Sequence, residues 1–358
     1  MKVTIVGGGN VGTQFAVHFS QENDVYIYTS KPEEYISSIE LVDENDNNIL
    51  TGKNIKATND SKIAFENSDL IFITYPAFEM ENAAKIIYPY VKEGTKIGLI
   101  PGTGGGECAF KQCIDKGAII FGMQRVPSVA RIVERGKKVK AVGYRNELSV
   151  ASLPSKYCDE IANIIEKTFK IKCKSLPNYL NNTLTPSNPI LHTTRLRTIF
   201  KNYKDGVVYD SLPLFYEGWN DETSDLLLKC DEEVQNICKA LANFDLKNVK
   251  SLKEHYESNN SKELTHKIKS ITGFKGLTTP SVKTANGYIP DLNSRYFTAD
   301  FPYGLSILIQ IGKMLGVSVK SMEETMDWYK KISNNKNEYN FKKYEINNKD
   351  DFINFYSR

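Results

Sequence analysis

Length, composition and charge already exclude several classes of protein. Apolar residues make up 41% of the 358 residues and charged residues 25%, and 46 basic residues against 43 acidic ones leave a net charge of +3. These proportions are typical of globular proteins. So small a basic surplus argues against a nucleic-acid or membrane partner. The length predicts two domains, because a single hydrophobic core rarely extends beyond about 250–300 residues.

The six cysteines show neither a CxxC motif nor a Cys/His pairing at zinc-ligand spacing. We therefore expect free thiols and no metal site. The chain starts on a strand-like segment with no signal peptide, and no apolar run reaches membrane-spanning length. These features together predict a protein of the reducing cytoplasm.

Strand-like and helix-like segments alternate through the first half of the chain. Buried strands are expected over 2–7, 24–29, 68–76, 95–102, 118–123 and 138–144. Helices are expected over 10–21 and 78–91, and residues 40–58 have the pattern of a small hairpin with a polar turn. The alternation predicts a mostly parallel sheet covered by helices on both faces.

The pattern changes near residues 174–189, where three prolines and several asparagines interrupt it. Helical periodicity dominates the rest, over 191–203, 221–244, 261–272 and 304–317. We therefore predict an α/β Rossmann-like dinucleotide-binding domain over 1–180 and an all-α C-terminal domain over 181–358 for substrate and catalysis.

A glycine-rich turn, "VTIVGGGNVGTQFA", follows the first strand and opens the first helix. Gly7, Gly9 and Gly12 have the G-x-G-x-x-G spacing, and Asn10 and Val11 lie in the same turn. Gly7 permits the tight turn, Gly9 lets the backbone approach a pyrophosphate, and Gly12 allows close helix–sheet packing. The helix N-terminus faces the anion. The combination of strand, spacing and helix predicts a dinucleotide site rather than a plain glycine-rich turn.

The second predicted strand ends without the acidic residue that NAD-preferring sites place there. Thr29, Ser30 and Lys31 offer hydroxyls and a cation instead, which suit the 2′-phosphate of NADP(H). The alternative is an ordinary polar loop leading into Pro32. We infer that NADP(H) is favoured over NAD(H).

Two more turns follow predicted strands. "LIPGTGGGE" places Gly102 and Gly104 at a carboxyl strand end, where open α/β sheets bind ligands. These glycines are expected to bring backbone close to the nicotinamide or the substrate, the alternative being a flexible loop. Tyr75 and Pro76, at the end of "LIFITYP", form another turn expected to face the cofactor.

The candidate chemistry lies in two distant stretches of the second half. In "SNPILH", Asn188 suits a helix N-cap and Pro189 the first helical position, so His192 falls near the first turn. The positive helix end disfavours imidazolium, so a proton-carrying histidine needs a carboxylate nearby. "NSRYFTADFPYGL" supplies Arg295 and Asp300. Considered singly, His192 is a structural residue, Arg295 a surface cation and Asp300 an N-cap.

Taken together, these stretches change that interpretation. The segments "GGGNVG", "IPGTGGGE", "NPILH", "FYEGWNDETSDLLL" and "RYFTADFPYGL" resemble the opine dehydrogenase family, of octopine/nopaline dehydrogenase type, over nearly the whole chain. The resemblance implies a dinucleotide-binding domain, a helical domain, and the reductive joining of an amino acid to a 2-oxo acid by NAD(P)H. By position, His192 resembles the catalytic histidine, Asp300 its carboxylate partner, Arg295 the cation near substrate carboxylates, and Asn188 the asparagine of the same motif.

These residue types suit the implied chemistry. A guanidinium holds a carboxylate through two parallel hydrogen bonds. A histidine near neutrality polarises a carbonyl oxygen and passes a proton, while Asp300 fixes its tautomer. A cleft between the domains is expected to exclude water and orient both reactants. Tyr216, Glu217 and Trp219 line the substrate pocket or, alternatively, belong to the core.

Two other functions fit the same architecture. One is a ketopantoate reductase-like enzyme acting on a 2-oxo or hydroxy acid, for which a lysine base in the helical domain is expected. No lysine here has a setting as suggestive as that of His192. The other is a non-enzymatic protein that senses NADP(H), against which His192, Asp300 and Arg295 argue.

Overall fold

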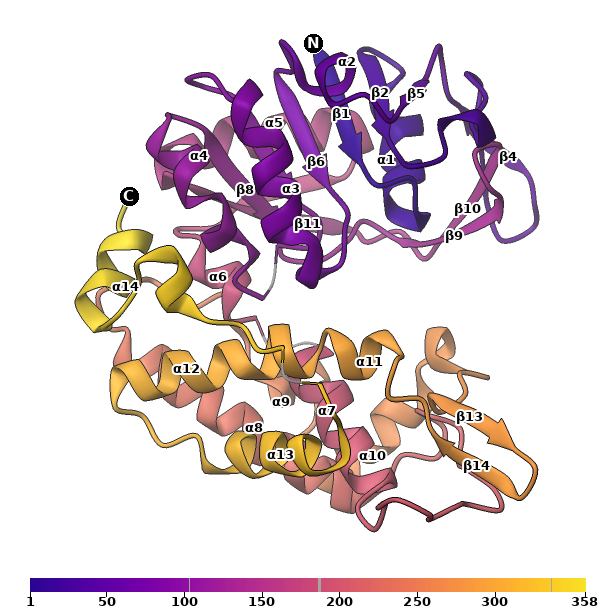
Figure 1. Ribbon diagram of the computed structural model, residues 1–358, viewed down its shortest axis with the longest axis vertical. Helices are drawn as coiled ribbons and strands as arrows, with labels where there is room; N and C mark the ends of the chain where they lie inside the picture. The colour runs from indigo at the N-terminus through magenta and orange to yellow at the C-terminus, as the bar shows by residue number, and fades with distance from the viewer. Residues whose placement is uncertain (103, 186–187, 336) are drawn as a thin grey trace. The chain divides into compact units, whose positions relative to one another are not determined.

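The chain folds into two units, each with its own core (Figure 1). The computed structural model describes residues 1–102, 104–185, 188–335 and 337–358. The first unit comprises Met1–Thr183 together with Ile353–Arg358, and the second comprises Leu184–Phe352. The division lies three residues after the predicted boundary at 180/181. The return of the last residues to the first unit was not predicted.

An eight-stranded sheet forms the centre of the first unit, with the strand order β12-β11-β8-β7-β6-β1-β2-β5. All neighbours pair in parallel except β8 and β11. The strands are β1 (Lys2–Val6), β2 (Asp24–Tyr28), β5 (Lys56–Thr58), β6 (Leu70–Ile73), β7 (Lys96–Leu99), β8 (Ile119–Met123), β11 (Glu147–Leu153) and β12 (Lys172–Ser175). The predicted mostly parallel sheet is confirmed.

Helices cover both faces of this sheet. On one face, α1 (Asn10–Phe19) contacts α5 (Cys158–Phe169), and their aromatic side chains join the strand side chains in one core. Phe15 lies against Phe72 and Phe169, with ring centroids 5.1 and 4.9 Å away. The remaining helices are α2 (Ser61–Phe65), α3 (Met80–Ile87), α4 (Lys111–Asp115) and α6 (Leu180–Thr183). The central strands β1, β6, β7 and β8 are buried over almost their whole length, so they are almost continuously apolar.

A second, four-stranded sheet packs beside α1, in the order β4-β3-β10-β9. Its strands are β3 (Glu40–Val42), β4 (Asn48–Thr51), β9 (Val129–Glu134) and β10 (Lys138–Val142). The β3–β4 pair is the hairpin predicted over 40–58, except that residues 56–58 form β5 and pair with β2 in the main sheet. Residues 138–144 were predicted as another strand of the main sheet, and this was wrong. They form β10, which pairs with β9 and β3.

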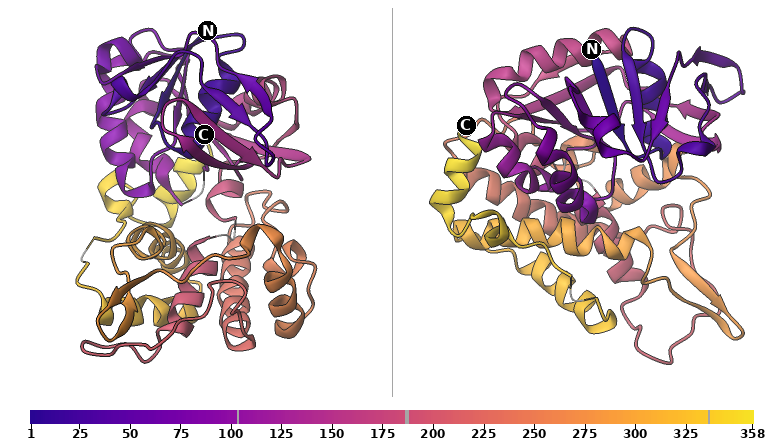
Figure 2. Two further views of the ribbon diagram at one scale, coloured as in Figure 1. Left: turned by 90° about the vertical axis from the view of Figure 1, so that its right-hand side faces the viewer. Right: turned by 45° about the horizontal axis from the view of Figure 1, so that its top comes forward.

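The second unit is built mainly from helices (Figures 1 and 2). They are α7 (Asn188–Ile199), α8 (Asp221–Ala240), α9 (Leu252–His255), α10 (Ser261–Ser270), α11 (Arg295–Thr298), α12 (Ser306–Leu315), α13 (Lys320–Ile332) and α14 (Lys349–Tyr356), the last of which ends in the first unit. Helix α8 contacts α7, α10, α12 and α13. The unit is not entirely α, because β13 (Ser281–Thr284) and β14 (Gly287–Pro290) form an antiparallel hairpin.

Candidate active site

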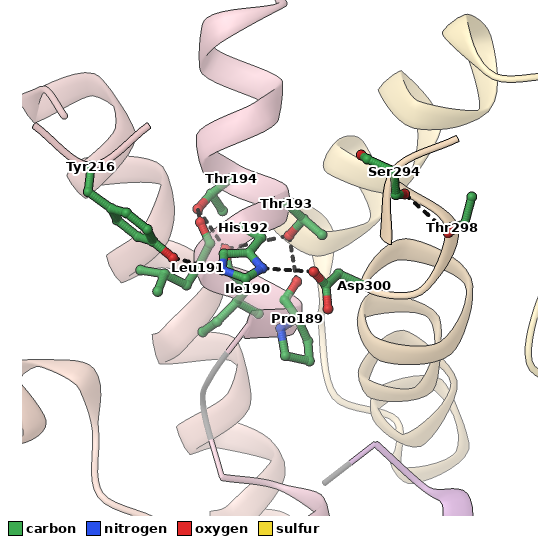
Figure 3. Close-up of polar contacts among 10 residues, drawn as sticks. All are labelled: Pro189, Ile190, Leu191, His192, Thr193, Thr194, Tyr216, Ser294, Thr298 and Asp300. Carbon is green, nitrogen blue, oxygen red and sulfur yellow. Dashed lines mark hydrogen bonds and ion pairs between the residues drawn. The ribbon is translucent and has the colours of Figure 1, made fainter. Parts of the chain in front are cut away.

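His192 and Asp300 meet in the second unit, although 108 positions separate them (Figure 3). The Nδ1 atom of His192 lies 2.8 Å from Oδ2 of Asp300. Both side chains are largely buried, with 10% and 18% of their surface exposed. An ionised carboxylate can only accept a hydrogen bond, so Nδ1 carries the proton and Nε2 is left as the basic nitrogen. The predicted pair is therefore present as a hydrogen-bonded dyad.

Tyr216 occupies the other nitrogen of the His192 ring. Its hydroxyl lies 2.8 Å from Nε2 and donates to that nitrogen, because the ring proton is on Nδ1. Burial raises the pKa of the phenol, and Tyr296, Tyr256 and Asp300 raise it further, so Tyr216 remains a neutral donor. Tyr216 was predicted only as a pocket-lining or core residue. Its contact with His192 forms across a gap of 24 positions and has no sequence signature.

Aromatic rings fix the orientation of the Tyr216 and His192 side chains. The Tyr216 ring stacks on Phe274, with centroids 4.0 Å apart, and lies parallel to Trp219 at 6.1 Å. The His192 ring lies 4.4 Å from the ring of Tyr296 and edge-on to Phe215 at 5.7 Å. Aromatic side chains lose little conformational freedom when packed, so they hold a hydrogen-bonding group in place at low entropic cost.

Helix α7 carries His192 in a stretch that is buried nearly all round. Two threonines follow the histidine, and their hydroxyls donate back to backbone carbonyls one turn earlier. Thr193 bonds to Pro189 O and Thr194 to Ile190 O, each at 2.6 Å (Figure 3). Their polar groups are thereby satisfied inside the protein, which lets a polar sequence form a buried helix.

The chain widens into a π-helical turn over Phe301–Leu305, directly after Asp300. The amide of Leu305 donates to the carbonyl of Asp300 at 2.8 Å. Gly304 in this turn packs against Pro189 at the start of α7, where an added Cβ would lie 2.9 Å from proline ring carbons. The N-P-x-x-H and D-x-P-x-G segments therefore fit together physically: the proline and the glycine make the close contact that brings Asp300 to His192.

Arg195 holds the segment that carries Tyr216. Only 2% exposed, its guanidinium donates to the carbonyls of Phe215 and Gly218, each at 2.8 Å. It also lies 5.5 Å from the ring of Trp219. Burial lowers the pKa of Arg195 to about 10, which leaves it charged at neutral pH. Carbonyl dipoles stabilise this buried charge, and in return the arginine fixes residues 215–218. Arg195 lies one helical turn after His192 and was not predicted as a residue of the site.

The other two residues predicted to take part in catalysis, Arg295 and Asn188, are the first residues of their helices. Arg295 is the first residue of α11 and is exposed, and it forms no ion pair within the described residues. Asn188 is exposed at the start of α7, one residue before the predicted first helical position. Neither touches the His192–Asp300 pair through a hydrogen bond in the part of the chain that is described. Their predicted roles toward substrate remain predictions.

The glycine-rich turn in the first unit has the shape that a dinucleotide needs. An added Cβ at Gly12 would lie 1.9 Å from Gly7 O, so this glycine is required for packing. Around Gly9, by contrast, there is open space, and no side chain caps the N-terminus of α1. Free amide groups at an open helix N-terminus fit a pyrophosphate. Asn10 faces elsewhere: its side-chain oxygen accepts a hydrogen bond from Ile132 N at 2.8 Å.

Residues 74–76 support this turn. The hydroxyl of Thr74 donates to Val6 O and Gly7 O at 3.0 and 3.1 Å. The ring of Tyr75 lies against Gly7, where an added Cβ would be 3.0 Å away, and Pro76 follows as the N-cap of a short 3-10 helix. The predicted turn thus lies beside the glycine-rich loop, and Thr74 is an additional residue that shapes it.

The residues after β2 form a small polar cluster. Thr29 is 8% exposed, whereas Ser30 and Lys31 are at the surface. The strand itself ends without an acidic residue, as predicted. However, the loop brings Glu34 to Lys31, with 3.2 Å between Nζ and Oε1.

The second glycine cluster is explained partly by packing. An added Cβ at Gly102 would lie 2.5 Å from Cα of Gly122 in β8. Gly104 and Gly105 have φ values of +91° and +69°, which lead the chain to the buried Glu107. Gly102 is therefore required because its backbone lies close to the backbone of Gly122, and not only because a ligand could approach it. Thr103 lies outside the described residues.

No group of three or more metal-ligating side chains occurs within the described residues. In the same part of the chain, none of the helices combines the length and apolar character needed to cross a membrane.

Comparisons with known proteins agree with this division of the chain. Residues 175–333 match the family model "NAD/NADP octopine/nopaline dehydrogenase, alpha-helical domain". Residues 2–103 match the model "NAD-dependent glycerol-3-phosphate dehydrogenase N-terminus". The first match covers the His192, Tyr216 and Asp300 segments, and the second covers the glycine-rich loop and β2.

Individual relatives match over most of their length. Tauropine dehydrogenase of Arabella iricolor is 27% identical over 92% of this chain and 91% of its own. Octopine dehydrogenase of Pecten maximus is 26% identical over 76% of this chain and 71% of its own. A solved structure of octopine dehydrogenase with NADH and pyruvate has a TM-score of 0.84 at 22% identity, covering 99% of this chain and 98% of that one. This last similarity establishes the fold.

Proposed function

We propose that this chain, a member of the opine dehydrogenase family and an NAD(P)-dependent oxidoreductase, reductively condenses an amino acid with a 2-oxo acid. The product is an N-carboxyalkyl amino acid. The observation that carries the proposal is the His192–Asp300 hydrogen bond within the matched helical domain. NADPH, when bound, supplies the hydride that reduces the imine formed between the two substrates.

The residues of the second unit perform the acid–base work. The ionised Asp300 keeps the proton of His192 on Nδ1 and stabilises the ring when it becomes charged. The basic Nε2 accepts a proton as the amine attacks and returns it to the carbonyl oxygen as water leaves. In the resting state the Tyr216 hydroxyl occupies the lone pair of Nε2, so Nε2 accepts the proton only after this hydrogen bond opens. Arg295 binds the carboxylate of the 2-oxo acid, and Asn188 contacts the substrate from the start of α7.

The residues of the first unit bind the dinucleotide. The open helix N-terminus at Gly9 holds the pyrophosphate, and Thr29, Ser30 and Lys31 favour NADP(H) over NAD(H). The octopine dehydrogenase structure contains NADH. The preference for the 2′-phosphate is therefore proposed from the residues of this chain.

A matrix of amino acids against pyruvate, glyoxylate and 2-oxoglutarate tests the reaction. NADPH oxidation is followed by absorbance, and the product mass is read by mass spectrometry. We expect oxidation only where both substrates are present, with a product whose mass is that of the amino acid plus the oxo acid, less one oxygen atom. Rapid oxidation by an oxo acid alone would instead indicate a ketopantoate reductase-like enzyme. Tight cofactor binding without turnover across the matrix would indicate a sensing protein.

A further inference from the structure

The tip of the β9–β10 hairpin lies against the loop that follows β2. The amide of Ile36 donates to Gly136 O at 3.1 Å. Gly136, with φ +70°, packs so closely that an added Cβ would lie 2.0 Å from Glu34 O. The same hairpin is tied to the glycine-rich turn by the Asn10–Ile132 hydrogen bond. Two anchors therefore hold the tip, and with it Arg135, beside the dinucleotide loops.

Glu34 stands between two cations at this point. Its Oε1 lies 3.2 Å from Lys31 Nζ, and its Oε2 lies 3.4 Å from Arg135 Nε. The Glu34 side chain is 31% exposed, while Lys31 and Arg135 are 60% and 56% exposed. Ion pairs this exposed contribute little stability, so replacing the carboxylate by another anion costs little. The cluster has two positive charges against one negative charge.

Tyr35 connects this cluster to the glycine-rich turn. Its hydroxyl donates to Gly8 O at 2.6 Å. Burial raises the pKa of this phenol, and the charge of Arg135 and hydrogen bonds with the Thr29 and Arg135 side chains oppose that rise. One hydroxyl thus touches the glycine loop, the end of β2 and the hairpin arginine. This is the place where a Rossmann-like fold holds the ribose of the adenosine.

We propose that Arg135 and Lys31 together form the binding site for the 2′-phosphate of NADP(H), and that Glu34 is the carboxylate which this phosphate displaces. The inference rests on the proposed function, whose cofactor it specifies further. A guanidinium offers a dianionic phosphate two parallel hydrogen bonds, and the ammonium adds a second charge. A carboxylate in the same place accepts ribose hydroxyls and repels a phosphate. Glu34 therefore lowers the preference for NADP(H), whereas Arg135 raises it.

Calorimetric titration of the full chain with NADP+, NAD+ and adenosine 2′,5′-bisphosphate tests this site without turnover. We expect Arg135→Ala to raise the Kd of NADP+ and of the bisphosphate about tenfold or more, while the Kd of NAD+ changes less than about twofold. Arg135→Lys should retain part of the affinity. Glu34→Gln should lower the Kd of NADP+ several-fold. The matched control is Lys137→Ala, a cation at the same hairpin tip that pairs with Glu134 instead, and it should change neither.

Equal loss of NADP+ and NAD+ in Arg135→Ala would overturn the inference, as would no loss of either. A wild-type protein that binds NAD+ as tightly as NADP+ would also overturn it. Each of these results leaves the condensation reaction intact, because that reaction is read from substrate-dependent turnover. If Arg135→Ala does not fold, Arg135→Lys and Glu34→Gln decide: unchanged affinity ratios in both would exclude the site.

Discussion

At the scale of single residues, the site depends on how both nitrogens of His192 are satisfied. Asp300 and Tyr216 each lie 2.8 Å from one of them. Two residues of the site, His192 and Asp300, could be predicted because they lie within recognisable motifs. The hydrogen bond of Tyr216 to His192 could not be predicted, because a phenol and an imidazole on separate segments have no characteristic spacing in the sequence. Arg195 was missed for the same reason: its partners are backbone carbonyls, which every residue has.

Tyr216→Phe removes only the hydroxyl and keeps the stacking on Phe274 and Trp219. Leaving the buried Nε2 without its donor frees the imidazole to turn from its productive orientation. We expect kcat to fall about tenfold and Tm to fall by a few degrees, since an unsatisfied buried nitrogen costs about 1–3 kcal/mol. Steady-state kinetics beside a thermal melt check this. An unchanged kcat would mean that the hydroxyl only fills space.

Arg295→Ala removes the exposed guanidinium at the start of α11. If Arg295 anchors the carboxylate of the oxo acid, the apparent KM for that substrate rises about tenfold or more, because a charge-assisted pair is lost. The KM for NADPH should not change. Lys331→Ala, an exposed cation of α13, serves as the control. An unaltered KM for the oxo acid in Arg295→Ala would exclude this role.

At the scale of elements, contacts between helices and turns decide the geometry. The alternating pattern predicted a mostly parallel sheet and the helices α1, α3, α7, α8, α10 and α12, because buried strands and amphipathic helices have distinct periods. It gave no expectation for the long helices α5 and α13. It placed β10 in the wrong sheet, since partner choice between strands is a tertiary property. The β13–β14 hairpin was missed although the sequence contains the dipeptide Asn286-Gly287, a local hairpin signal. In the structure Ala285 and Asn286 form the turn, and Gly287 begins β14.

Gly304→Ala tests the contact that joins the two motif segments. Its Cβ would lie 2.9 Å from ring carbons of Pro189, so the π-helical turn must shift away from α7. Overpacking of this kind costs on the order of 1–3 kcal/mol of unfolding free energy, and the shift moves Asp300 from His192. We expect loss of stability in urea together with lower kcat. Gly273→Ala, with open space around its Cβ position, should change both very little.

At the scale of the whole molecule, the end of the chain returns to the first unit. Tyr356 donates a hydrogen bond of 2.5 Å to the fully buried Glu107, which also accepts from the Thr183 hydroxyl. Burial raises the pKa of Glu107 to about 7, although these two hydrogen bonds act to lower it. This closure joins positions 249 residues apart. Local sequence patterns contain no information on such a contact, which is why the C-terminal residues were assigned to the wrong domain.

Glu107 makes stability depend on pH. Its ordinary pKa is 4.5 and its folded pKa is about 7, so between these values the folded state keeps a proton that the unfolded chain releases. Stability therefore falls as pH rises through this window. Glu107→Gln carries no titrating proton. Relative to this variant, the wild type should lose on the order of 3 kcal/mol between pH 4.5 and 7.5. Urea unfolding of both proteins measures the difference, and parallel pH profiles would refute the titration.

The most direct test of the proposed reaction is NADPH oxidation by the wild type, by Asp300→Asn and by the control Asp327→Asn. Asp327 is an exposed carboxylate of α13. Each protein is assayed with an amino acid and an oxo acid together and with each alone. We expect the wild type and Asp327→Asn to oxidise NADPH only with both substrates. Asp300→Asn should be slower by about a hundredfold or more while binding NADPH equally well. Oxidation without the amine, or a wild-type rate in Asp300→Asn, would contradict it.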